Sequence, residues 1–185
     1  MDLKQLCHLA AVPPPDSKGR VWVPLMGENY AVVVEGQQVL LNGREPARPD
    51  KGLIVLHYLI GAMSIEPTGK LVSFRELQGG DVYWLAYEGR SINRLQDFFG
   101  ERPAALHDAV KGLKAKRAGM GDAGYVIEAL PKVPVTVAVW AGDDEIPPSA
   151  NVLWDETVRY YLHTEDVAVL GGIVASELIN RAPLD

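Results

Sequence analysis

The stretch from residue 125 to residue 154 constrains the fold more than any other part of this sequence. Two runs rich in β-branched residues, 125–130 and 135–140, are separated by a break that contains Pro131 and Pro134. A short apolar run, 150–154, follows an acidic turn. Runs of this length and composition, bounded by turn-forming residues, are typical of β-strands. We therefore predict a β-rich region here, built around two consecutive strands.

A second β-rich region lies near the N-terminus. Its first two runs, 20–25 and 30–34, are separated by four residues, a spacing that favours a hairpin. A further turn leads into a third apolar run at 39–41, so a three-stranded meander is the simplest interpretation. The strands therefore cluster towards both ends of the chain, whereas most helix is expected between and after them, which is typical of an α+β fold.

The strongest helix signals lie at 50–62 and 165–181. Asp50 can cap the first helix, whose residues are apolar on every face. A helix that is apolar all round is buried, so we predict a central core helix. Thr164 can cap the second helix, and the acidic residues that follow it suit the positive end of the helix dipole. Weaker apolar patterns predict further helices at 2–11, 91–99 and 103–118.

These patterns together predict an α+β fold with a largely antiparallel sheet. The sheet is expected to pack on the buried central helix at about 50–62 and on the C-terminal helix at about 165–181. We expect one domain spanning 1–185, because this length can bury a proper core without disulfides. Residues 1–19 are expected to form an N-terminal helix and a proline-rich arm.

Composition excludes several classes of function. A formal net charge of −6 argues against nucleic acid as a partner, because phosphate binding needs a basic surface. Cys7 is the single cysteine, so the chain alone cannot hold an iron–sulfur cluster, which usually takes four thiolates. No signal-peptide pattern and no apolar run of about 20 residues is present, so no membrane contact is expected. These features predict a cytoplasmic protein.

A glycine-rich motif, G-x-G-x-x-G, occupies residues 119–124. A dinucleotide site requires this motif after a strand and at the start of a helix. Here the order is reversed, since the motif follows a predicted helix and precedes a predicted strand. We therefore interpret it as a flexible helix-to-strand loop.

The acidic turn offers two interpretations. Asp143 and Asp144, if the fold brings them near His163 and Glu165, would form a metal site of histidine and carboxylate ligands. The alternative is a solvated tight turn followed, further along, by an ordinary pair of charges at a helix start. The turn lacks the regular spacing of a calcium loop. The second interpretation is favoured, because carboxylates are common in surface turns.

His57 is the most informative polar residue in an apolar context. It lies on the predicted core helix, where it is either a neutral histidine bonded to a backbone carbonyl or a group that faces a cleft as ligand or base. The segment 73–76 has the Ser-x-x-Glu form of a capping box. The ligand-binding residues that we predict are His57, Arg75, Glu76, Asp144, Glu145 and Asp166. Arg75 would pair with an anionic group of the ligand.

Several short motifs resemble the family described as domain of unknown function 3786. The first group is Leu56-His57-Tyr58-Leu59, Ser73-Phe74-Arg75-Glu76-Leu77 and Gly79-Gly80. The second group includes residues 130–134, 142–145, 147–149 and 164–166. The resemblance implies a setting in anaerobic one-carbon or redox metabolism. Some members carry an iron–sulfur label, which does not transfer to a chain with one cysteine. The resemblance implies no reaction and no catalytic residue.

Three hypotheses about function follow. The first is an accessory or binding domain for a small cofactor, a metal centre or a redox partner, with the ligand between the sheet and the helix at about 50–62. The second is a metal-dependent enzyme that uses the acidic cluster with His163. The third is a protein-interaction module without a small ligand, in which these carboxylates are capping and turn residues. The sequence identifies neither the ligand nor the oligomeric state.

Overall fold

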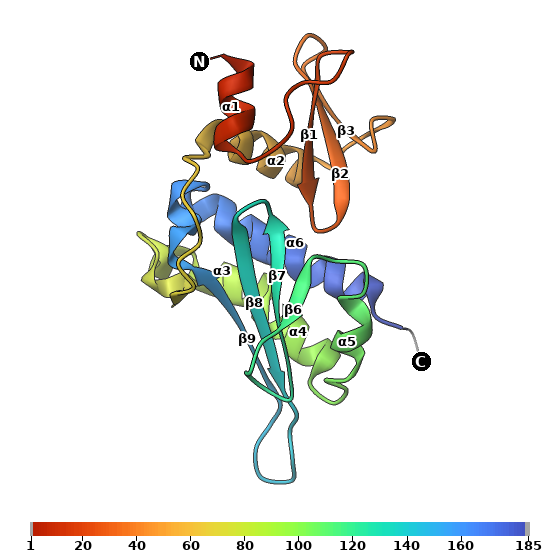
Figure 1. The fold of residues 1–185 in the computed structure, drawn as a ribbon. Helices are drawn as coiled ribbons and strands as arrows, with labels where there is room; N and C mark the ends of the chain where they lie inside the picture. The colour runs from red at the N-terminus through yellow and green to blue at the C-terminus, as the bar shows by residue number, and fades with distance from the viewer. Residues whose placement is uncertain (1, 184–185) are drawn as a thin grey trace.

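The fold is α+β, as predicted, and contains two antiparallel sheets (Figure 1). The computed structural model describes residues 2–183. Residue 1 and residues 184–185, the ends of the expected single domain, lie outside the described residues. One sheet lies beside the first two helices, and the other lies against the later helices.

The smaller sheet is the predicted N-terminal meander with one short strand added. Its strands follow in sequence order and are β1 (Arg20–Leu25), β2 (Glu28–Val33), β3 (Gln38–Leu41) and β4 (Glu45–Pro46). Met26 and Gly27 both have positive φ, which is the geometry of the two-residue turn that suits a twisted hairpin. The alternating burial of β1 places Val21, Val23 and Leu25 in the core.

The larger sheet contains the β-rich region predicted from residue 125 onward. Its order is β5-β9-β8-β7-β6. Its strands are β5 (Leu71–Ser73), β6 (Ala115–Arg117), β7 (Ala123–Leu130), β8 (Val133–Trp140) and β9 (Ser149–Asp155). The register pairs Val126 with Thr136 across β7 and β8. Successive side chains alternate between faces, so Val135, Val137 and Val139 enter the core while Thr136 lies on the opposite face.

Four helices pack on the core side of the larger sheet or on one another there. They are α3 (Gly80–Arg90), α4 (Ile92–Phe99), α5 (Ala105–Ala109) and α6 (Thr164–Arg181). The C-terminal helix was predicted within one residue. Gly171 lets α6 approach α3 closely, because a Cβ at this position would overlap the ring of Tyr87.

The prediction of one helix over 103–118 is wrong, because only residues 105–109 are α-helical. The structure ends α5 at Ala109 and turns at Gly112, which has a φ of 78° that favours glycine. Residues 115–117 then form β6, the edge strand beside β7. Pairing with β7 satisfies the backbone groups of this segment, and this long-range gain overrides its local helix preference. Residues 82–87 belong to α3.

The central helix lies where the sequence predicts it but is not buried on all sides. α1 (Leu3–Leu9), α6 and the smaller sheet cover one side of α2 (Pro49–Gly61). Ile54, Val55 and Tyr58 are therefore buried. Leu53 and Ile60, on the other side, are 46% and 63% exposed. The expectation of a helix buried all round is therefore wrong, because no element covers this side within residues 2–183.

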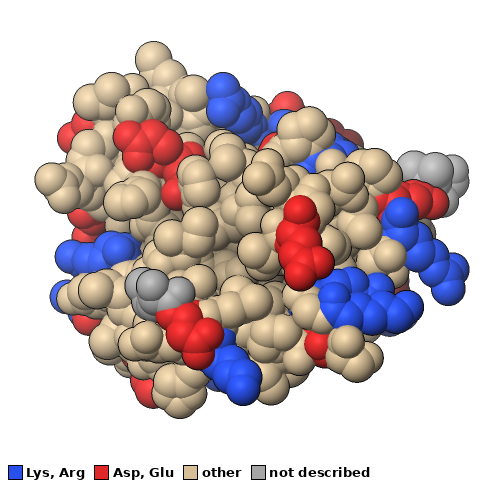
Figure 2. Space-filling model, turned by 90° about the horizontal axis from the view of Figure 1, so that it is seen from above, with Lys and Arg blue, Asp and Glu red and all other residues tan. Residues whose placement is uncertain are grey.

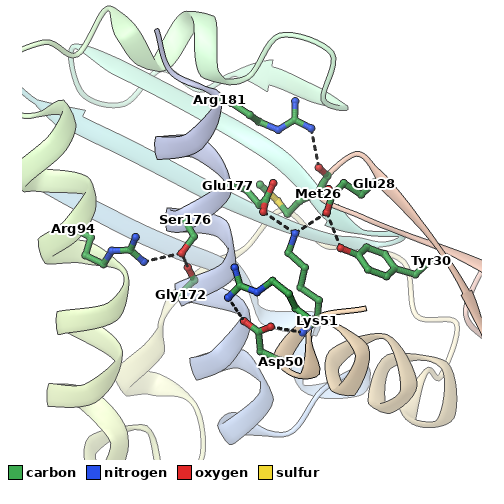
Figure 3. Close-up of polar contacts among 11 residues, drawn as sticks. Met26, Glu28, Tyr30, Asp50, Lys51, Arg94, Gly172, Ser176, Glu177 and Arg181 are labelled. Atoms are coloured by element: carbon green, nitrogen blue, oxygen red, sulfur yellow. Dashed lines mark hydrogen bonds and ion pairs between the residues drawn. The ribbon is translucent and has the colours of Figure 1, made fainter. Parts of the chain in front are cut away.

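A charged junction joins α2, the smaller sheet and α6 (Figure 3). The Nζ of Lys51 lies 2.6 Å from Glu28 Oε2 and 2.7 Å from Glu177 Oε1. Tyr30 donates its hydroxyl to the same Glu28 oxygen at 2.6 Å. Burial favours the neutral amine, but the two carboxylates outweigh it and raise the pKa of Lys51 above its usual range. The sequence offered no sign of this network, since its members come from three distant segments.

Candidate functional site

The candidate site begins with a histidine and an aspartate that come from different helices. His57 lies near the end of α2, and Asp166 lies in the first turn of α6, 109 residues away in the sequence. His57 Nδ1 is 2.7 Å from Asp166 Oδ1. The other carboxylate oxygen accepts a hydrogen bond from the backbone N–H of His163 at 3.3 Å. The start of α6 therefore fixes the aspartate, and the aspartate orients the histidine ring.

The two partners differ in exposure, which decides the chemistry of the pair. The side chain of Asp166 is 8% exposed, whereas that of His57 is 43% exposed. An ionised carboxylate only accepts hydrogen bonds, so the proton of a neutral His57 ring lies on Nδ1. The second ring nitrogen, Nε2, then keeps a lone pair for a ligand or a proton. The pair thus combines a buried orienting group with an accessible reactive one.

A cavity of about 380 Å³ adjoins the pair. Its wall includes His57, Ile60, Met63, Arg159, Tyr160 and His163. A neighbouring cavity of about 360 Å³ shares Arg159 and His163 and extends towards Gln78 and Glu165. Both cavities meet at the short helical turn η2 (Glu156–Tyr160) and the first turn of α6. This region is therefore hollowed around a small set of polar groups within a largely apolar wall.

Arg159 supplies the positive charge of the cavity. Its Nε donates to the backbone oxygen of Glu156 at 2.8 Å, which holds the side chain against η2. No ion pair joins Arg159 to a carboxylate in the part of the chain that the structure describes. The terminal N–H groups of its guanidinium thus remain available for an anion, which this planar fork binds well. Sequence reasoning missed Arg159 and Tyr160, since no local motif marks them.

The structure places two of the predicted ligand-binding residues outside this cavity. Arg75 Nε lies 2.9 Å from Asp81 Oδ1, and its guanidinium lies over the ring of Trp84. Glu76 ends the 3-10 turn η1 (Phe74–Glu76) and accepts from the backbone N–H of Ser73 at 2.6 Å. This is the capping box that the sequence predicted. Hydrogen bonds from Ser73 lower the pKa of Glu76 below its usual range.

The predicted acidic residues lie in the loop between β8 and β9, which extends away from the start of α6 (Figure 1). Asp143 Oδ1 accepts backbone hydrogen bonds from Glu145 at 2.9 Å and from Ile146 at 2.7 Å, which lower the pKa of Asp143. This is the geometry of a solvated tight turn. The structure therefore does not bring Asp143, Asp144 and Glu145 to His163 and the first turn of α6.

His163 and Glu165, the other two predicted metal ligands, line the second cavity. Glu165 accepts its own backbone N–H and the hydroxyl of Tyr83, the latter at 3.0 Å, and these bonds lower the pKa of Glu165. Within residues 2–183, no group of three or more histidine, cysteine, aspartate or glutamate side chains is arranged to hold a metal ion. Of the predicted residues, the structure brings together His57 and Asp166, with His163 beside them.

The glycine-rich motif has a different setting from the one predicted. Residues 119–124 connect β6 to β7, so the motif joins two strands rather than a helix and a strand. It opens no helix, and a dinucleotide site of the usual kind is therefore absent from this segment.

None of the helices within residues 2–183 has the length and apolar character that a membrane span requires.

On the face shown in Figure 2, basic and acidic side chains alternate around largely uncharged areas. No continuous basic area covers this face.

Comparison with known proteins gives a family but no activity. No curated protein and no solved structure matches this chain. One family does match, and it spans residues 2–177, which include both halves of the His57–Asp166 pair. This match confirms the resemblance seen in the sequence. The chain belongs to the family described as domain of unknown function, DUF3786.

Proposed function

We propose that this chain is a binding module for a small organic anion, held in the cavity between α2, η2 and α6. One observation carries the proposal. The His57–Asp166 pair and the guanidinium of Arg159 line the same cavity, and most of the remaining wall is apolar. The ligand class is a molecule with a carboxylate or phosphate head group on a short apolar body.

The polar groups of the cavity favour an anionic head group. Arg159 offers a planar fork of N–H donors that matches two oxygens of a carboxylate or phosphate. His57, when protonated, adds a second donor held in place by Asp166. The positive end of α6 is already occupied by its own carboxylates, Glu165 and Asp166, so the anion would depend on Arg159 and His57. These two side chains favour negative charge at the same place.

The apolar wall favours a body of limited size. Ile60 of α2, Met63 just after that helix and Tyr160 of η2 border the cavity. A volume of about 380 Å³ lies near the lower end of the range, about 300–1,000 Å³, that is usual for small-molecule sites. The body is therefore closer in size to a single ring or a short alkyl chain than to a dinucleotide.

The wider setting is part of the same proposal. The module would act as an accessory domain that holds a small cofactor or metabolite for a partner enzyme in anaerobic metabolism. A cytoplasmic location agrees with its one thiol, Cys7, which is buried and has a pKa raised by burial. No reaction is assigned to the site.

Isothermal titration calorimetry with three probes of similar shape tests the proposal. Phenyl phosphate and benzoate carry the two candidate head groups, and benzyl alcohol is the neutral match. We expect saturable binding of at least one anion and about tenfold weaker binding of the alcohol, because the charged hydrogen bonds are lost. Arg159→Gln should weaken binding of the anion by a similar factor. Arg44→Gln, on an exposed turn, should leave the affinity for the anion unchanged. Equal affinity for all three probes would contradict the proposal.

Native mass spectrometry with metal analysis separates the proposal from the two other hypotheses. The protein should be purified without oxygen, so that a sensitive ligand survives. A bound organic mass supports the binding module. A stoichiometric metal without an organic mass supports a metal-dependent enzyme, and a bare chain with a co-purifying protein supports the interaction module.

A further inference from the structure

The open face of the larger sheet forms a third cavity, separate from the two cavities beside α6. It is a trough of about 920 Å³, and it shares no lining residue with the two cavities beside α6. Its floor is formed by β7 and β8, on the face opposite to the core. No helix covers this face in Figure 1. Neither the family match nor the proposed function accounts for such a hollow surface.

The floor of this sheet trough contains an unpaired polar group. Val126 and Thr136 lie opposite each other in the register, and Pro134 is the next residue of β8 on the same face. Thr136 is only 2% exposed, and its hydroxyl has no hydrogen-bond partner. A buried hydroxyl without a partner is unfavourable. The hydroxyl lies within the sheet and is not accessible from the trough.

The rim of the sheet trough carries three lysines, two of which are neutralised. Lys114 pairs with Glu128 at 2.9 Å, and Lys132 pairs with Glu66 at 2.7 Å. Lys116 lies opposite Val126 in the register of β6 and β7, so it belongs to the same face. It has no carboxylate partner among the residues that the structure describes. Asp155 also lines the trough, but its carboxylate is held by the backbone N–H groups of Gly69 and Thr157. Lys116 is therefore the lysine of the rim that has no carboxylate partner among the described residues.

The glycine-rich motif closes one side of the sheet trough. Gly119 and Met120 are part of its lining. Gly124 allows the loop to fold back, because a Cβ at this position would overlap the backbone oxygen of Met120. On the opposite side, Pro67 and Leu71 border the hollow. The walls on both sides are therefore largely apolar, and the glycines of the motif serve this shape rather than a phosphate.

We infer that the sheet trough binds an elongated, mainly apolar molecule with one acidic head group. The apolar body lies along Val126 and Pro134, and the head group pairs with Lys116. Charge complementarity selects this ligand class, since Lys116 is the rim cation without a carboxylate partner in the described residues. The volume suits a larger ligand than the α2–α6 cavity can hold.

Fluorescence titration with anilinonaphthalene sulfonate tests this inference, because this probe combines an apolar body with one acidic group. We expect saturable binding of one probe per chain, and displacement by decanoate at about tenfold lower concentration than by decanol. Lys116→Gln should weaken the binding of decanoate about tenfold and leave the binding of decanol unchanged. Lys18→Gln, in the loop before β1 and away from the trough, is the matched control.

A second variant, Thr136→Val, tests the floor of the sheet trough. Thr136→Val keeps the shape of the side chain and removes only the hydroxyl, so the fold should survive. We expect unchanged probe affinity and an unchanged far-ultraviolet circular dichroism spectrum, because the hydroxyl is not accessible to the probe. The inference is overturned if the probe shows no saturable binding to the folded protein. Equal affinity of decanoate for wild type and Lys116→Gln would also overturn it.

Discussion

Helices α2 and α6 are joined by two charged contacts that differ in one respect. Lys51 meets Glu177 towards the end of α6, and His57 meets Asp166 at its beginning, each at 2.7 Å. The first contact is closed, with side chains 9% and 13% exposed, and a second carboxylate, Glu28, completes it. The second contact is open, since the His57 side chain is 43% exposed beside a cavity.

This comparison separates a structural contact from a candidate functional one. Around Lys51, the amine and the carboxylates satisfy one another, so the network has little capacity left for a ligand (Figure 3). Around His57, one ring nitrogen and the guanidinium of Arg159 remain available. The same two helices thus hold the molecule together at one end and present a binding site at the other.

The largest effect is expected at the closed contact. Lys51→Met leaves the partly buried Glu28 and Glu177 without their cation, and breaking a buried pair costs about 3–5 kcal/mol of unfolding free energy. Urea denaturation followed by circular dichroism measures this loss. Lys70→Met, which removes an exposed pair with Glu156, is the control and should cost at most about 1 kcal/mol. A similar small cost for both variants would show that the Lys51 network is not structural.

Acid should also act on the closed contact. Burial opposes ionisation of Glu28, but hydrogen bonds from Lys51 and Tyr30 outweigh it and hold the pKa of Glu28 below its usual value. A lowered carboxyl pKa contributes stability above its unfolded value, about 4.3, and this contribution disappears as the pH falls through the folded value. Thermal unfolding from pH 7 to pH 3 should show a steeper acid loss in wild type than in Glu28→Gln. Identical pH profiles would contradict this account.

A smaller effect is expected from the hydroxyl of Tyr30. Tyr30→Phe removes its hydrogen bond to Glu28 and leaves the Lys51 ion pairs in place. One such bond to a charged group contributes about 1.5–3 kcal/mol, which is less than the loss expected for Lys51→Met. Urea denaturation of the single and double variants measures the coupling between the two residues. Additive losses would mean that the hydroxyl and the amine act independently.

The smallest effect on stability is expected at the open contact. His57→Gln removes an exposed ring but supplies an amide N–H for the buried Asp166 carboxylate, so the unfolding free energy should fall by no more than about 1 kcal/mol. The affinity for phenyl phosphate or benzoate should nevertheless fall about tenfold. Denaturation and calorimetry on the same preparation measure both quantities. A large loss of stability with unchanged affinity would reverse the comparison and make this contact structural.

The sequence predicted the architecture well where patterns are local. The strands after residue 123 and the helix α6 follow from β-branched runs and from an apolar stripe with acidic residues at its start. The exposed side of α2 could not be predicted, because apolar composition does not reveal which side other elements cover. Residues 115–117 form a strand only because β7 lies beside them, a contact that local propensity does not contain.

The candidate site was predicted only in part, for a related reason. The sequence singled out His57 for its apolar context and Asp166 for its place at a helix start. It could not pair them, since their contact joins segments 109 residues apart. Arg159 lies in a short helical turn without a motif, and Lys51 reads as an ordinary charge near a helix start. Charged residues acquire a role from their partners, and only the fold supplies the partners.

The central claim is that the open contact receives the small anion. The chain contains four histidines, His8, His57, His107 and His163, which serve as built-in reporters. Proton–carbon NMR of their ring signals should be followed while phenyl phosphate or benzoate is added. The account predicts that the signals of His57 and His163 move together and saturate, while those of His8 and His107 stay in place. Signals that all stay in place, or all move alike, would contradict it.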